Sequence, residues 1–175
     1  MLANYRIIDA DSHVFEPTEM WPDYLPSEFK AFAPSTDMTI KGEKIYHKIS
    51  AQVRQIGIQQ IMKSHSASVL SRFSPESHLR AMEQMGIDIA YVYPTISLWL
   101  LGIDTMEPKI AGAFVHAYNN WLRDYCSYNP QRLQGVGTIN LHEPEQMISE
   151  LRRVAEFGWT AVVLRPNLVK LTSCT

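Results

Sequence analysis

Residues 129–167 read "NPQRLQGVGTINLHEPEQMISELRRVAEFGWTAVVLRPN", and this stretch decides the fold class. The apolar run "LQGVGTINL" is typical of a buried strand, and "WTAVVLRPN" predicts another. Between them, "HEPEQMISELRRVAEFG" predicts a helix with a proline near its start, a glycine at its end and a core face of Met147, Leu151 and Val154. A strand, a helix and a strand in this order indicate a βα unit of a parallel sheet.

The same alternation occurs earlier in the chain. "SPESHLRAMEQMG" predicts a helix with Ser74 as N-cap, Pro75 in the first turn and Gly86 as its stop. "IDIAYVYPT" follows as an apolar strand. A long helix is expected over roughly 106–128. Its apolar stripe consists of Ile110, Phe114, Ala117, Trp121 and Tyr125.

The first third of the chain is less regular. "YRIIDA" predicts a short strand, residues 18–35 a loop with helical turns, and "TDMTIKGEKIYHKIS" a small hairpin. We expect one partial barrel domain over residues 1–175, with residues 18–73 forming an excursion over the catalytic face and residues 168–175 an atypical tail. The order of elements fits either a doubly wound sheet or part of a (β/α)8 barrel. No glycine-rich phosphate loop follows the first strand, which disfavours nucleotide binding.

Composition excludes several classes of function. A net charge of -2, with 46% hydrophobic and 19% charged residues, is typical of a soluble, cytoplasmic globular domain. No run of Lys and Arg indicates nucleic acid or an anionic membrane surface as a partner. The N-terminus lacks a signal-peptide pattern, and the apolar stretch around Pro94 is too short to span a bilayer. Cys126 and Cys174 lack metal-ligand spacing and are expected to be free thiols.

Residues 9–17, "DADSHVFEP", carry the chemistry. Asp11 and His13 are two residues apart after an apolar run, so on a strand their side chains point to the same side. Two donors on one cation lie roughly 3–3.5 Å apart when each bond is about 2.0–2.2 Å, and these side chains are long enough to converge that far. A carboxylate and an imidazole suit zinc, manganese or another divalent metal. A strand end capped by Asp and Ser, with His13 bonded to backbone, is the alternative.

Three segments together carry a family resemblance. "IIDADSHVFEP", "HLRAMEQMGIDIAYVYPT" and residues 129–167 resemble, in this order, the amidohydrolase-related (amidohydrolase 2) family, which includes aminocarboxymuconate-semialdehyde decarboxylase and resorcylate-type decarboxylases. The resemblance runs from Ile7 to Asn167. It implies a metal-dependent (β/α)8 TIM barrel with Asp11 and His13 as its first two metal ligands. Because a complete barrel takes about 250 residues, we expect a half-barrel: the first four βα units plus an inserted hairpin and loop excursion.

The family completes its site with a late His and a late Asp, and neither has a matching position before Thr175. We therefore assign no catalytic residue. Glu16 is expected to steady His13 or to contact substrate. His142 follows the third expected strand, where it either binds substrate or begins the next helix. Arg165 and Asn167 end the fourth strand, where they either hold a substrate carboxylate or close the turn.

The resemblance implies a metal-dependent hydrolase or a non-oxidative decarboxylase, a lyase, acting on a small aromatic or unsaturated carboxylic acid or a related amide. Zinc is the expected divalent metal, with manganese as the alternative. The partners expected are a small-molecule substrate and a second copy of the chain, because a half-barrel leaves its edge strands unpaired. The alternative function is a truncated, catalytically inactive half-barrel that acts only through self-association or binding.

Overall fold

The fold is built on one parallel sheet. In the computed structural model, residues 5–34, 39–40, 43–44, 73–103 and 106–165 are described. Four strands pair in the order β1-β4-β5-β6, all parallel. They are β1 (Ile8–His13), β4 (Ile89–Tyr93), β5 (Leu133–Thr138) and β6 (Ala161–Val163). Each strand pairs with the next strand of the βα series and the order never reverses, so the sheet is the half-barrel that the sequence predicts and lacks the switch point of a doubly wound sheet.

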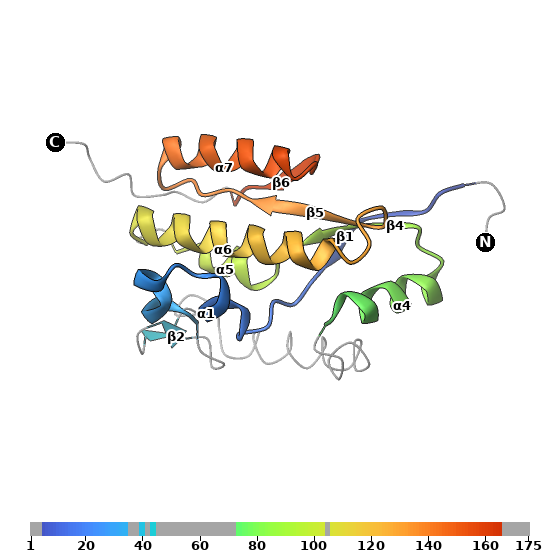
Figure 1. Ribbon diagram of the computed structural model, residues 1–175, viewed down its shortest axis with the longest axis horizontal. Coiled ribbons are helices and arrows are strands. Elements are labelled where there is room, and N and C mark those ends of the chain that lie inside the picture. Colours follow the sequence, from blue (N-terminus) through green and yellow to red (C-terminus); the bar gives the residue numbers. More distant parts are fainter. Residues whose placement is uncertain (1–4, 35–38, 41–42, 45–72, 104–105, 166–175) are drawn as a thin grey trace.

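Three long helices connect these strands (Figure 1). They are α4 (Pro75–Met85), α6 (Pro108–Cys126) and α7 (Pro144–Glu156). All three were predicted from local signals. In α4 the backbone N–H of Ser77 donates to the Ser74 hydroxyl, and Gly86 adopts a left-handed φ of 71° that suits a helix end.

The smaller elements are α1 (Met20–Tyr24), the 3-10 helix η1 (Ser27–Phe32), α5 (Ile96–Leu100), and the antiparallel pair β2 (Thr39–Ile40) and β3 (Glu43–Lys44). The helical turns and the hairpin were predicted, whereas α5 was not. Helices α1 and η1 contact α6. Residues 45–72 and 168–175 lie outside the described residues, so the path of most of the excursion and the nature of the tail stay predictions.

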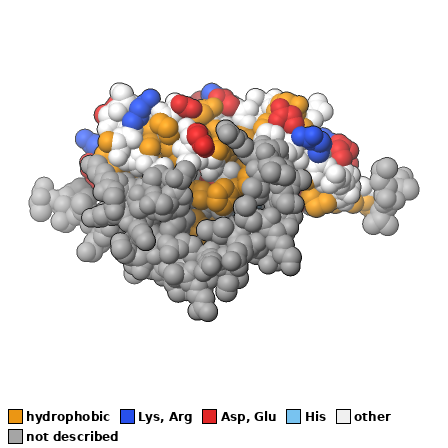
Figure 2. All heavy atoms as spheres, turned by 90° about the horizontal axis from the view of Figure 1, so that it is seen from below, with side chains coloured by type: hydrophobic (Ala, Val, Ile, Leu, Met, Phe, Trp, Pro, Cys, Tyr) orange, Lys and Arg blue, Asp and Glu red, His pale blue; other side chains and the backbone are white. Residues whose placement is uncertain are grey.

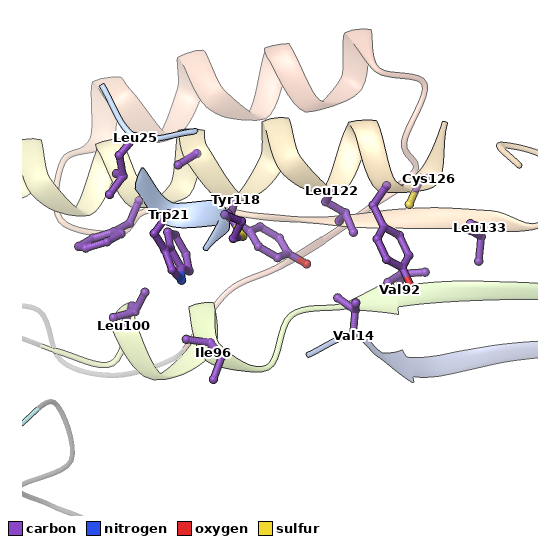
Figure 3. Close-up of a cluster of buried hydrophobic side chains, with 14 of the residues drawn as sticks. Val14, Trp21, Leu25, Val92, Ile96, Leu100, Tyr118, Leu122, Cys126 and Leu133 are labelled. Atoms are coloured by element: carbon purple, nitrogen blue, oxygen red, sulfur yellow. The ribbon is translucent and has the colours of Figure 1, made fainter. Parts of the chain in front are cut away.

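One apolar cluster joins the sheet to the helices (Figure 3). Along β4, Ala90 and Val92 are fully buried, while the alternating residues are only half-buried. The labelled side chains in Figure 3 come from α1 (Trp21) and the residue after it (Leu25), α5 (Ile96, Leu100), α6 (Tyr118, Leu122, Cys126), the strands (Val92, Leu133) and the segment after β1 (Val14). Burial raises the pKa of the Cys126 thiol to about 12, so this thiol stays protonated.

Helix α7 departs from its predicted core face. Val154 is buried as expected, but Leu151 is 46% exposed and the neighbouring Glu150 is buried instead. Glu150 accepts hydrogen bonds from Asn119 and Arg153, which compensate for the cost of burying its charge. The helical spacing identified the apolar residues of α7, but Leu151 lies on its exposed side. Glu150, with its hydrogen bond from Asn119, lies on the buried side instead.

The surface seen in Figure 2 carries Lys and Arg side chains interspersed with Asp and Glu, and apolar side chains lie between them. This mixture agrees with the near-neutral charge of the sequence. Among the described residues, no helix is both long and apolar enough to cross a membrane.

Candidate metal centre

Asp11 and His13 lie at the C-terminal end of β1. The register of β1 against β4 shifts between Asp9 and Ser12, which indicates a β-bulge next to Asp11. After the bulge His13 pairs with Tyr93, and their rings lie 5.8 Å apart. Strand ends of this kind gather functional groups in βα barrels, and bulges there re-aim side chains.

The two predicted ligands lie at ion-pair distance from each other. Asp11 Oδ1 lies 3.5 Å from His13 Nε2, and their side chains are 84% and 44% exposed. Donor atoms on one divalent ion lie about 3.0–3.5 Å apart. The pair therefore fits a divalent metal in donor chemistry and in separation. No group of three or more His, Cys, Asp or Glu residues suited to a metal occurs within the described ranges.

Thr95, directly after β4, is a site residue that the sequence analysis missed. Its hydroxyl lies 3.2 Å from Nδ1 of His13. This contact is made at Nδ1, whereas the other ring nitrogen, Nε2, faces Asp11. The signal was present in the sequence: the run "YVYPT" ends a parallel strand with a polar residue, which is where site residues of this fold collect.

Glu16 is fully buried and its carboxylate accepts backbone hydrogen bonds. The donors are the N–H groups of Thr95, Ile96 and Ser97, with the shortest distance 2.8 Å to Ile96. Burial raises the pKa of this carboxyl above its ordinary value, and the backbone N–H donors oppose that effect. These bonds make Glu16 the cap of α5, so substrate binding by Glu16 stays a prediction that its observed contacts do not favour.

His142 is buried, and both ring nitrogens face oxygen atoms. Nδ1 lies 2.7 Å from Asn140 Oδ1, and Nε2 lies 3.0 Å from the backbone carbonyl of Ile103. The Asn140 oxygen also accepts from the backbone N–H of His142 at 2.8 Å. These contacts hold His142 in the loop before α7, and its predicted role in beginning this helix stays a prediction. Its role in substrate binding stays a prediction.

Arg165, beyond the end of β6, contacts α5. Its guanidinium donates to the carbonyl of Leu98 and lies 5.6 Å from the Trp99 ring centre. A side chain at Gly102 would collide with this guanidinium, because an added Cβ there lies 2.6 Å from Arg165 Cζ. Arg165 thus connects the end of β6 to α5, and both predicted roles of Arg165, holding a substrate carboxylate and closing the turn, stay predictions. Asn167 lies outside the described residues.

A second polar chain begins at Ser12, which lies between Asp11 and His13 in the sequence. Ser12 Oγ is 2.9 Å from His78 Nε2, and His78 Nδ1 is 3.1 Å from the Tyr125 hydroxyl. Burial lowers the pKa of His78, so its ring is neutral at pH 7. These bonds tie β1 to helices α4 and α6, and they agree with a structural role for His78.

The similarity of this chain to known proteins lies in its fold. No family model matches the sequence, and no curated protein matches it. Among solved structures, an amidohydrolase from Mycobacterium avium subsp. paratuberculosis is 20% identical with a TM-score of 0.66, and the match covers 93% of this chain and 50% of that one. A 5-carboxyvanillate decarboxylase from Novosphingobium aromaticivorans, with bound manganese and 3-methoxy-4-hydroxy-5-nitrobenzoic acid, is 21% identical with a TM-score of 0.58, covering 95% and 44%.

A 2,6-dihydroxybenzoate decarboxylase from Rhizobium is 14% identical with a TM-score of 0.52, and the match covers 91% of this chain and 38% of that one. The chain therefore spans half or less of the length of these structures. At this level of identity the comparisons establish the fold alone: the chain has the fold of one part of a TIM barrel.

Proposed function

We propose that this chain is part of a metal-dependent enzyme of the amidohydrolase-related family, in the branch that resembles aminocarboxymuconate-semialdehyde decarboxylase. One observation carries the proposal: Asp11 Oδ1 and His13 Nε2 lie 3.5 Å apart at a strand end of this fold. The fold is shared over more than nine-tenths of the chain with an amidohydrolase and two aromatic-acid decarboxylases.

Asp11 and His13 hold a divalent ion, with zinc or manganese as the candidates. Manganese is supported by its presence in the 5-carboxyvanillate decarboxylase structure. A bound divalent ion supplies a Lewis acid and lowers the pKa of its water. Thr95 orients the His13 ring. Glu16 secures the segment that carries Thr95.

The substrate is a small aromatic or unsaturated carboxylic acid, or a related amide. The aromatic class is supported by two of the similar structures, a 5-carboxyvanillate decarboxylase and a 2,6-dihydroxybenzoate decarboxylase. Decarboxylation and hydrolysis are the two candidate reactions. The cytoplasmic location expected from the composition stays a prediction.

Turnover of named acids tests the proposal. The purified chain, supplied with Mn²⁺ or Zn²⁺, is incubated with 5-carboxyvanillate or 2,6-dihydroxybenzoate, and carbon dioxide release is measured. We expect metal-dependent release that falls more than about 100-fold in His13→Asn. The control is His116→Asn, a histidine of α6 whose side chain is 48% exposed. A folded, metal-loaded protein that releases no carbon dioxide and hydrolyses no aryl amide contradicts the enzyme proposal.

The second candidate function is self-association of a catalytically inactive half-barrel. Strands β1 and β6 form the two edges of the described sheet. Apolar side chains are exposed at both edges: Ile8 is 53% exposed and Leu164 is 49% exposed. An exposed edge with apolar side chains favours pairing with another chain.

A further inference from the structure

Helix α5 is capped by a residue from another part of the chain. The Glu16 carboxylate accepts the N–H groups of its first residues, at 3.1 Å from Thr95, 2.8 Å from Ile96 and 3.0 Å from Ser97. Helix N-termini leave such N–H groups without partners inside the helix. Glu16 satisfies all three from a position roughly eighty residues earlier, and it is only 1% exposed.

Because Glu16 accepts the N–H groups at the start of α5, the Thr95 hydroxyl is not needed as their acceptor. Threonine at an N-cap usually turns its own oxygen back onto the first N–H groups of the helix. Thr95 stands at that position in α5, yet its side chain makes no such bond. Its hydroxyl instead lies 3.2 Å from His13 Nδ1. The same residue is thus held through its backbone by Glu16 and contacts His13 through its side chain.

The contact with Thr95 is made at Nδ1, the ring nitrogen of His13 that does not face Asp11. Nε2 is the nitrogen near Asp11, so a metal held with Asp11 binds Nε2. Nδ1 must then carry the proton, and it needs an acceptor that orients the ring. The Thr95 oxygen is placed to be that acceptor.

We propose that Glu16 and Thr95 are positioning residues for His13. Glu16 caps α5 in place of the Thr95 side chain, and the Thr95 hydroxyl, which is then free, orients the imidazole toward the metal shared with Asp11. The inference rests on the proposed function, because it assigns the support of that site. In this proposal neither residue is a metal ligand.

Metal affinity of two matched variants tests the proposal. Mn²⁺ binding is measured by titration calorimetry for wild type, Thr95→Val and Thr95→Ser. Valine keeps the shape of the side chain but removes the oxygen, whereas serine keeps the oxygen. We expect Thr95→Val to weaken Mn²⁺ binding about 10–100-fold and Thr95→Ser to stay close to wild type. Equal affinity in wild type and Thr95→Val overturns the proposal.

A second measurement separates this inference from the proposed function. In the metal-free protein, the ¹⁵N chemical shift of His13 Nδ1 reports its hydrogen bond to Thr95. We expect Thr95→Val and Glu16→Gln to change this shift in the same direction, and Thr95→Ser to preserve it. An Nδ1 shift that is identical in wild type and Thr95→Val overturns the positioning role. Absence of Mn²⁺ binding in wild type, with the Nδ1 changes present, overturns the metal site alone.

Discussion

Two buried carboxylates show how the surroundings of a single residue decide its chemistry. Glu16 accepts hydrogen bonds from uncharged groups, chiefly backbone N–H groups, and burial raises its pKa. Burial acts in the same direction on Glu150, but hydrogen bonds from His116, Arg153 and Asn119 outweigh it and hold the pKa at about 2. The hydrogen bond from His116, followed by those from Arg153 and Asn119, favours the ionised form of Glu150.

Glu150 therefore makes stability depend on pH in the acid range. Its folded pKa of about 2 lies below its unfolded value of about 4.3, so the folded state binds fewer protons. The stabilisation is fully present above the unfolded pKa and is lost as the pH falls through the folded pKa. Between about pH 5 and pH 2, we expect wild type to lose about 3 kcal/mol more stability than Glu150→Gln.

Urea unfolding of wild type and Glu150→Gln at the two ends of this pH range measures the difference in their free energies of unfolding. The control is Glu145→Gln, an exposed glutamate in the first turn of the same helix. Parallel loss of stability in wild type and Glu150→Gln contradicts the assignment. A Glu145→Gln variant should follow wild type.

Among the elements, those with local signals were predicted and those that depend on distant contacts were not. Helix α4 carries its own cap, proline and glycine, so its bounds were predicted closely. Helix α5 has five residues, and its cap is Glu16, which no local pattern reveals. The β-bulge in β1 belongs to the same group, because it is defined only by pairing with β4.

The same distinction applies to the candidate site. Asp11 and His13 were predicted because residues two apart on a strand share a side, and the structure brings their donor atoms together. His142 and Arg165 were placed after the correct strands, but each also contacts a backbone carbonyl of a segment far along the chain. Thr95 was missed because its function depends on which residue caps α5. Contacts of this kind require the folded arrangement.

For the whole molecule, the four-stranded sheet leaves β1 and β6 as edges within the described part of the chain. Two copies that join β6 of one to β1 of the other close an eight-stranded parallel ring with twofold symmetry. If this pairing occurs, light scattering gives twice the mass of one chain. Ile8→Lys places a charge on the edge and should return the mass to that of a monomer.

Leu151→Lys is the matched control, because Leu151 is a similarly exposed apolar residue on helix α7. It should leave the dimer intact. A single-chain mass for wild type at every concentration contradicts the proposed self-association, whereas dissociation of both variants assigns the interface elsewhere.

The central claim is that Asp11 and His13 hold a divalent ion. Binding of Mn²⁺ and Zn²⁺ to the monodisperse, chelator-treated chain, measured as ions per chain by elemental analysis after equilibrium dialysis, tests it most directly. We predict saturation at about one ion per chain, with a large loss of affinity in Asp11→Asn and in His13→Asn. Absence of saturable binding, or equal binding by wild type and both variants, would contradict the claim.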